Sequence, residues 1–95
     1  MYIVNLSYLK SLDHIQLQLD AHLRFLDDQY ERGVFLASGP KNPRDGGVFL
    51  VRGTITRTEL DELLTYDPFF QAGLAKYSVI EFAPVKHHAA LAGIL

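Results

Sequence analysis

The chain has 95 residues, of which 48% are hydrophobic and 21% are charged, and its formal net charge is −2. This is the size and composition of one globular domain, without the positive excess that draws proteins to nucleic acid or anionic membranes. Cysteine is absent, which excludes disulfides, thiolate catalysis and thiolate zinc sites. No apolar run is long enough to cross a bilayer, and no basic flank precedes the first apolar stretch. We therefore expect a cytoplasmic domain with no signal peptide and no membrane partner.

A strand followed by a long helix is predicted for the first third of the chain. Residues 2–8 alternate between two faces, as in a strand. Asp13 is the expected N-cap of a helix that runs to about Arg32. Gly33 then provides the left-handed residue with which many helices end.

His22 occupies an unusual place in this helix. It falls on the apolar stripe that also contains Ile15, Leu19, Leu26 and Tyr30. Burial disfavours the charged form of a histidine unless a partner stabilises it. Taken alone, His22 is interpreted as a buried core histidine with its hydrogen bonds satisfied, and a functional role requires a partner from elsewhere in the chain.

Two short apolar strands are predicted at 34–38 and 47–51, joined by the turn-rich segment "GPKNPRDGG". Both strands carry apolar residues on both faces, since Phe35 alternates with Leu36 and Phe49 with Leu50. A sheet face left open to water is normally more polar than this. Burial of the second face against another copy of the chain is the simplest explanation, so the sequence predicts a homodimer.

The remaining elements are a short helix and a last strand. Thr56 and Glu59 have capping-box spacing, which predicts a helix over about 57–65. The Asp-Pro sequence of "YDPFF" is expected to end it, because the residue before proline is pushed out of the helical conformation. Residues 75–82 form the last predicted strand. The expected organisation is one domain over residues 1–85 and a tail without clear periodicity over 86–95.

The resulting order, β-α-β-β-α-β, is that of the α+β ferredoxin-like sandwich. Because βαβ crossovers are right-handed, the direction of each element follows from this order. His22, Ser38 and Asp67, which are far apart in sequence, are thereby brought to the same end of the sheet.

General acid–base chemistry is what these residues could share. A carboxylate that accepts a hydrogen bond from one imidazole nitrogen fixes the tautomer and leaves the other nitrogen to act as base. Ser38 and the backbone around Gly39 are candidates for binding a substrate oxygen. Each residue also has a purely structural interpretation, with Asp67 as a helix-stop residue and "SGP" as a turn. The functional interpretation is favoured only because His22, Ser38 and Asp67 are all expected at the same end of the sheet.

The segments "AHLRFLDDQYERGVFLASGP" and "YDPFF" resemble the YCII-related (YciI-like) family over about residues 2–83. The resemblance rests on a helix-borne His-Leu, on the spacing from Gly33 to Gly39-Pro40, and on a later Asp-Pro-Phe. It implies a dimeric α+β barrel of ferredoxin-like protomers, with His22 and Asp67 as the active-site pair and Ser38 as a pocket residue. It also implies activities of the isomerase and lyase kind, including dehydrochlorination.

We therefore expect a homodimer with a small-molecule acid–base site that needs no cofactor and no metal. In this hypothesis His22 acts as base or acid, Asp67 orients it, and Ser38 and Gly39 bind a small cyclic or aromatic acid. The alternative is a homodimer that binds a small ligand without catalysis.

Three other functions are alternatives, because proteins with these functions have the same element order or similar residues. "MYIVNL" is similar to the first-strand motif of RNA-recognition domains, but "DGGVFLVRG" offers Phe49 alone where that fold stacks bases on several aromatic side chains. His87 and His88 suggest a metal site, yet no further ligand has suitable spacing nearby. A haem-degrading or quinol monooxygenase would also use a dimeric barrel, and it ranks below acid–base chemistry.

Overall fold

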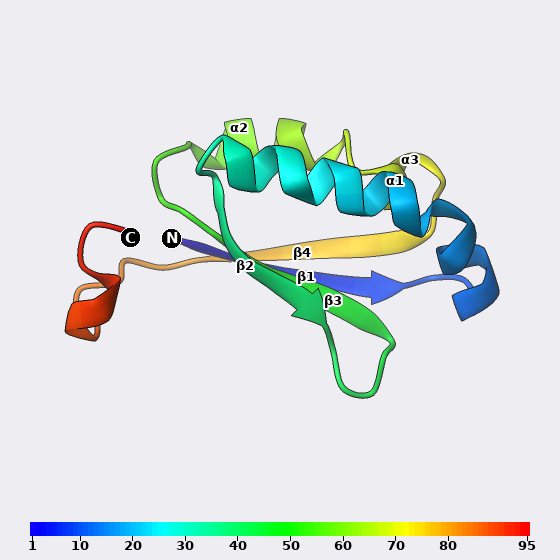
Figure 1. Ribbon diagram of the computed structural model, residues 1–95, viewed down its shortest axis with the longest axis horizontal. Coiled ribbons are helices and arrows are strands. Elements are labelled where there is room, and N and C mark those ends of the chain that lie inside the picture. The colour runs from blue at the N-terminus through cyan, green and yellow to red at the C-terminus, as the bar shows by residue number, and fades with distance from the viewer.

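The computed structural model describes residues 1–95, and its element order confirms the ferredoxin-like α+β prediction. The elements are β1 (Tyr2–Tyr8), α1 (Leu12–Glu31), β2 (Phe35–Pro40), β3 (Gly46–Val51), α2 (Arg57–Leu64), α3 (Pro68–Gln71), β4 (Ala75–Glu81) and a short 3-10 turn, η1 (Ala89–Leu91). The strands form one four-stranded sheet in the order β2-β3-β1-β4, and every neighbouring pair is antiparallel. Helices α1, α2 and α3 cover one face of this sheet (Figure 1).

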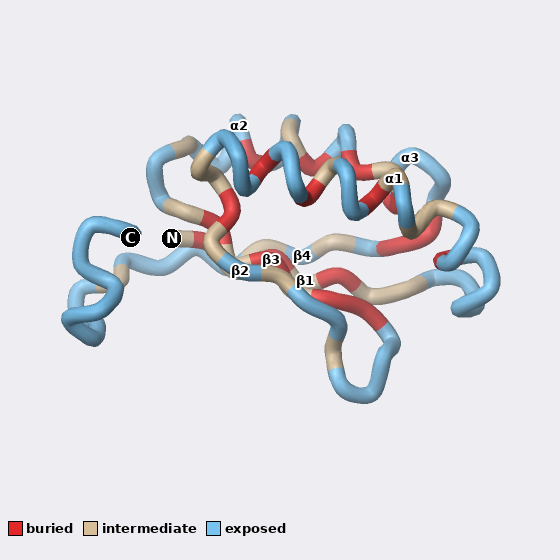
Figure 2. Tube along the Cα trace, viewed as in Figure 1, coloured by how far each residue is buried: buried red, intermediate tan, exposed pale blue.

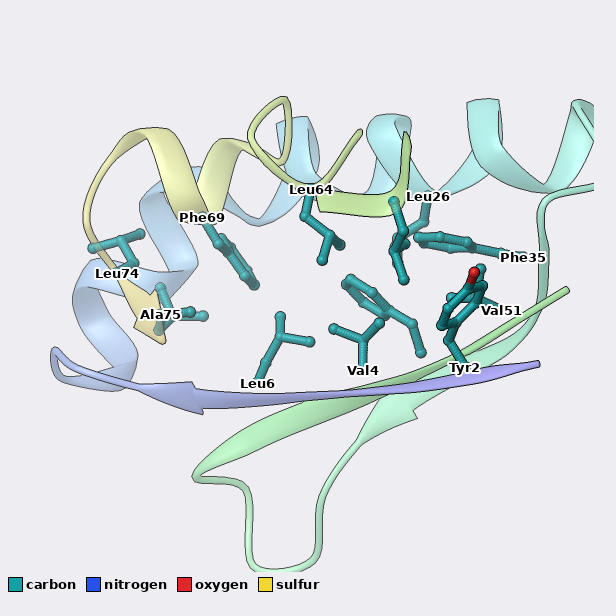
Figure 3. Close-up of a cluster of buried hydrophobic side chains, with 13 residues drawn as sticks. Tyr2, Val4, Leu6, Leu26, Phe35, Val51, Leu64, Phe69, Leu74 and Ala75 are labelled. Carbon is teal, nitrogen blue, oxygen red and sulfur yellow. The ribbon is translucent and has the colours of Figure 1, made fainter. Parts of the chain in front are cut away.

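The hydrophobic core lies between the sheet and the three helices (Figure 2). Strand alternation places one face of β1 and β3 under the helices. The largest fully buried side chains come from these strands and from all three helices: Val4, Leu6, Ile15, Val51, Leu60, Asp67 and Phe69. Figure 3 shows the apolar cluster filling the space between the layers. Asp67 is the exception in this set, a carboxylate with no solvent exposure.

The other face of the sheet is uncovered, and one row across it is apolar. Cross-strand pairing aligns Ala37, Leu50, Ile3 and Ile80, which we call the apolar row. Ile80 is 59% exposed. Phe49 points to the opposite face, where it is buried under the helices and cannot stack against a base.

The C-terminal residues continue past β4 on the side of the molecule where the N-terminus lies (Figure 1). They are mostly exposed, and the Arg52 guanidinium donates a hydrogen bond of 2.9 Å to the carbonyl of Gly93. No helix of the chain combines the length and the apolar character needed to cross a membrane.

Two predicted helix ends can be compared with the structure. The Thr56–Glu59 capping box is confirmed at the start of α2, where each residue bonds the other's backbone N–H. The Asp13 N-cap is wrong, because α1 begins two residues earlier than predicted, at Leu12, and Ser11 is its N-cap. The Ser11 side chain is hydrogen-bonded to His14 Nδ1 (2.9 Å) and caps no backbone group. Asp13 lies in the first turn, where its charge still complements the helix dipole.

Strand β2 differs from the prediction in length and in regularity. It extends to Pro40 instead of ending at residue 38, and its register with β3 shifts between Phe35 and Ala37. This β-bulge interrupts the alternation, so that Phe35 and Ser38 both lie opposite buried residues of β3. Regular alternation would have put these two side chains on opposite faces. The bulge therefore brings Ser38 to the helix-covered side of the sheet.

Candidate active site

His22 is held within the core by aromatic rings. It lies in the middle of α1 on the face directed at the sheet and is only 7% exposed. Its imidazole stacks on the ring of Phe69, with centroids 3.8 Å apart and planes 5° from parallel. Phe49 lies 6.0 Å away on a second stacked contact. These contacts restrict the ring to one orientation.

Asp67 starts a helix, in contrast to the prediction that the Asp-Pro sequence ends one. Helix α2 ends at Leu64, and Asp67 is the N-cap of α3 with Pro68 as the first helical residue. Its Oδ1 accepts a hydrogen bond of 3.0 Å from the N–H of Phe69. Proline at the first helical position and aspartate before it are both favoured at helix starts. The local sequence thus fixes the carboxylate at the point where α3 meets α1.

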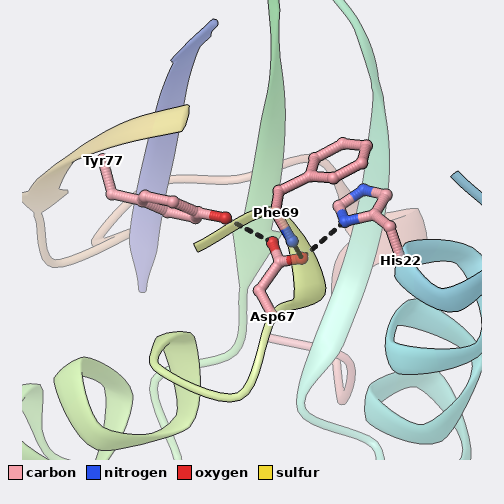
Figure 4. Close-up of polar contacts among 4 residues, drawn as sticks. All are labelled: His22, Asp67, Phe69 and Tyr77. Carbon is pink, nitrogen blue, oxygen red and sulfur yellow. Dashed lines mark hydrogen bonds and ion pairs between the residues drawn. The ribbon is translucent and has the colours of Figure 1, made fainter. Parts of the chain in front are cut away.

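The imidazole and the carboxylate meet directly. The Nδ1–H of His22 donates to Oδ1 of Asp67 over 2.7 Å, and the Tyr77 hydroxyl donates to Oδ2 over 2.6 Å (Figure 4). With the N–H of Phe69, three donors satisfy this buried carboxylate. Because an ionised carboxylate only accepts, this hydrogen bond requires a proton on Nδ1 of His22, so a neutral imidazole here is the Nδ1–H tautomer. In that tautomer the lone pair is on Nε2, which has no hydrogen-bond partner within the chain.

A cavity of about 390 Å³ adjoins this histidine. Its walls come from α1, from β1 and from the β2–β3 hairpin, and they are largely apolar. The lining residues are Leu6, Tyr8, Leu19, His22, Leu23, Leu26, Ser38, Gly39, Pro40, Arg44, Gly47, Phe49 and Phe69. The volume is in the range of small-molecule sites. A small-ring compound bound here would contact the imidazole.

The predicted site residues thus fall into two groups around this cavity. His22 and Asp67 are hydrogen-bonded to each other, and Asp67 lies behind the histidine rather than on the cavity wall. Ser38 and Gly39 line the same cavity as His22, and neither is hydrogen-bonded to the histidine. The Ser38 hydroxyl is hydrogen-bonded to the hydroxyl of Tyr30 at 2.6 Å. No group of three or more His, Cys, Asp or Glu side chains is placed to hold a metal ion.

Sequence reasoning missed Tyr77, Tyr30 and Phe69. The alternation of the last strand could have found Tyr77, since it shares a face with Ala75 and Val79. The Asp-Pro pair could have indicated a helix start, which would have put Phe69 in α3. The contact of Tyr77 with Asp67 has no comparable signal, because it depends on how β4 packs against α3.

Tyr77 gives the chain a pH-dependent contribution to stability. Burial and the adjacent Asp67 carboxylate raise the pKa of Tyr77 well above its ordinary value of about 10. The folded state therefore keeps a phenol proton that the unfolded chain releases in alkali. This contribution is fully present below pH about 10 and is lost as the pH rises further.

We expect the free energy of unfolding to fall more steeply above pH about 10 in the wild type than in Tyr77→Phe. The slopes should differ by up to about 1.4 kcal/mol per pH unit, which corresponds to one proton. Urea unfolding across the alkaline range measures both slopes. Tyr66→Phe is the matched control, because Tyr66 is 62% exposed. Equal slopes for wild type and Tyr77→Phe would contradict the assignment.

The fold and the site together define a class, that of small ferredoxin-like α+β domains with a buried histidine–carboxylate pair beside an apolar cavity. The chain belongs to the YCII-related domain family, whose model matches residues 1–83. The resemblance seen in the sequence is thereby confirmed.

A solved structure of another protein shares the fold. The structure is similar to that of 5-chloro-2-hydroxyhydroquinone dehydrochlorinase from Burkholderia phenoliruptrix, solved in complex with 2,5-dihydroxybenzoquinone. The TM-score is 0.67 at 21% sequence identity, and the match covers 87% of this chain and 94% of the other. At this identity the likeness shows a shared fold. No curated protein matches the sequence.

Proposed function

We propose that the protein is a homodimeric acid–base enzyme that moves a proton on a small cyclic or aromatic acid. The observation that carries the proposal is the 2.7 Å hydrogen bond between His22 and Asp67, which leaves Nε2 unpartnered beside the cavity. In the proposed mechanism Nε2 is the general base and its protonated form the general acid. Asp67 orients the imidazole and stabilises its positive charge, while Ser38 and Gly39 position a substrate oxygen.

The chemistry starts when Nε2 removes a proton from a carbon next to a carbonyl group. The C–H electron pair then becomes the π bond of an enolate. In an isomerase, the imidazolium returns the proton to another carbon of the same molecule. In a dehydrochlorinase acting on a chlorinated hydroquinone, the keto tautomer carries hydrogen and chlorine on one ring carbon. The base then removes the proton of the opposite ring hydroxyl, whose electrons form a second carbonyl and shift a C=C bond as chloride leaves, so that hydrogen chloride is lost and a quinone remains. Both outcomes need one base and one oriented carboxylate, and neither needs a cofactor.

The fold likeness to a dehydrochlorinase supports the lyase form of the proposal. That relative was solved with a single-ring quinone, and a molecule of this size is compatible with a cavity of about 390 Å³. The largely apolar wall suits a ring, and its few polar groups suit the ring's oxygens.

The function is tested first with 5-chloro-2-hydroxyhydroquinone, by measuring chloride release and product absorbance. A panel of single-ring lactones and keto acids in deuterated water, followed by proton NMR, tests isomerisation and exchange. We expect turnover or enzyme-dependent exchange of at least one compound, lost when His22 is replaced by alanine. Binding without turnover or exchange across the panel would overturn the proposal in favour of a ligand-binding protein.

The proposed dimer uses the uncovered sheet face. Burying the apolar row against a second copy would remove Leu50 and Ile80 from water, and burial of one such side chain contributes about 1.5–3 kcal/mol. We expect the wild type to be a dimer and Leu50→Lys to dissociate, since a charge would be buried twice in a symmetric interface. Sedimentation velocity measures both states.

Leu17→Lys is the control for that variant. Leu17 is 80% exposed on α1, away from the sheet face, and its replacement should leave a dimer intact. A monomeric wild type, or a Leu50→Lys protein that is still dimeric, would contradict the proposed interface.

A further inference from the structure

Two polar side chains of the cavity have no partner within the chain. Tyr2, Tyr30 and Tyr77 direct their hydroxyls to protein acceptors or donors, but the hydroxyl of Tyr8 does not. Arg44 takes part in none of the ion pairs. It is also the one permanently charged side chain on the cavity wall. These groups are free to bind a ligand.

The backbone holds these two residues at the same rim of the cavity. Tyr8 is the last residue of β1, and its N–H donates to the carbonyl of Asp45 over 2.8 Å, next in the chain to Arg44. Gly46, the first residue of β3, lies so close to β1 that a Cβ atom there would overlap the carbonyl oxygen of Leu6. A hydrogen bond of 3.0 Å from Lys41 Nζ to Asn5 Oδ1 fixes the other side of the turn.

The charge around the cavity is asymmetric. Asp67 lies behind the histidine, and both of its carboxylate oxygens are already occupied by three donors of the chain. Asp45 lies 4.0 Å from Lys41 and does not line the cavity. Arg44 is therefore a cation without a counter-charge at the edge of an apolar space, and a ligand anion would supply that charge. Guanidinium and phenol groups both donate hydrogen bonds, and charge-assisted bonds of this kind are the strong ones.

We infer that Arg44 and Tyr8 form an anion subsite, which binds the charged oxygen of a single-ring organic acid whose ring enters the apolar cavity toward His22. The charge is that of a carboxylate or of a deprotonated ring hydroxyl. The inference rests on the proposed function, because it assigns the binding of the substrate's charge within the same cavity. Arg44 and Tyr8 then hold the charged end of the ligand, while Nε2 of His22 reaches a carbon at the opposite end of the ligand's ring.

Binding of matched probes tests the subsite. Benzoate and benzamide have nearly the same shape and differ in charge, and 4-nitrophenolate and nitrobenzene form a second pair for the ring-hydroxyl case. Calorimetry should show that the wild type binds at least one anion about 10-fold or more tightly than its neutral counterpart. The preferred pair identifies the kind of anion.

The variants assign the effect to residues. Arg44→Gln should weaken binding of the preferred anion by about 10- to 100-fold, as expected for lost hydrogen bonds to a charged group, and leave the neutral probe unchanged. Arg44→Lys should keep part of the affinity, and Tyr8→Phe should lose less than Arg44→Gln. Arg24→Gln is the control, because Arg24 is exposed on α1 and does not line the cavity.

The outcomes separate this inference from the proposed function. Anion preference that disappears in Arg44→Gln supports the subsite even if no compound is turned over, in which case the enzyme proposal alone fails. Turnover that depends on His22 but is unchanged in KM and kcat by Arg44→Gln overturns the subsite alone. Equal affinity for charged and neutral probes, or binding of neither probe at millimolar concentration, also overturns it.

Discussion

Replacing His22 by alanine is expected to remove proton-transfer turnover and to leave the protein folded. General acid–base catalysis by a positioned side chain contributes about 10²- to 10⁴-fold to a rate, and no other base adjoins the cavity. The variant also loses the stacking on Phe69 and one of the three donors to Asp67. We therefore expect a stability loss of about 2–4 kcal/mol beside the loss of activity.

A second variant separates the chemical role from the structural one. His22→Gln keeps an amide donor for Asp67 and more of the side-chain volume, so it should be more stable than His22→Ala and equally inactive. His14→Ala is the control, because His14 lies in the first turn of the same helix and is exposed. Circular dichroism and urea unfolding measure folding, and the chloride or exchange assay measures turnover. Residual turnover close to that of the wild type in His22→Gln would contradict its role as the base.

Replacing Asp67 should have the largest effect on stability. Asp67→Ala would leave the imidazole N–H, the Phe69 N–H and the Tyr77 hydroxyl without an acceptor in a region with no solvent exposure. Unsatisfied buried donors cost about 1–3 kcal/mol each, so a total loss of about 3–5 kcal/mol is expected after local relaxation. For a domain of this size, that loss is a large part of the total stability.

Asp67→Asn should be milder for the fold and still severe for activity. An asparagine can accept from Phe69 and fill the same volume, but it lacks the charge that stabilises a protonated imidazole. Because His22 and Phe69 share Oδ1, an oxygen kept at that position turns the NH₂ group toward Tyr77, whereas the flipped amide turns it toward both His22 and Phe69. Nitrogen NMR of His22 should then show that the preference for the proton on Nδ1 is reduced, together with about a 10²- to 10⁴-fold loss of turnover. Wild-type turnover in a folded Asp67→Asn protein would contradict an orienting role for this carboxylate.

The sequence was most informative where one local rule decided the structure. Period-two alternation predicted β1 with its observed bounds, and the Thr56–Glu59 box marked the start of α2. Element order and crossover handedness were enough to bring His22 and Asp67 to one end of the sheet, because they depend only on chirality. The 2.7 Å contact between these side chains is present in the structure, while their catalytic roles stay predictions.

Contacts that depend on packing between elements far apart in the sequence could not be predicted from it. The hydroxyl of Tyr77 reaches Asp67 because β4 lies against α3, and no spacing in the chain reports that contact. The side on which Ser38 lies was not predictable either, since a bulge is a departure from the alternation on which strand prediction depends. That Tyr8 and Arg44 have no side-chain partner within the chain is likewise visible only from the contacts in the folded structure.

The bulge in β2 also bears on how this family can vary in length. Deleting one residue from a regular strand exchanges its two faces, so strands seldom tolerate such a change. Between Phe35 and Ser38 the opposite holds, because the ladder with β3 already absorbs one residue too many. A relative one residue shorter at Leu36 would regain plain alternation and still present its serine to the cavity. We therefore expect that relatives can differ by one in the number of residues between the histidine and the serine, and that aligning such relatives needs a gap inside this strand.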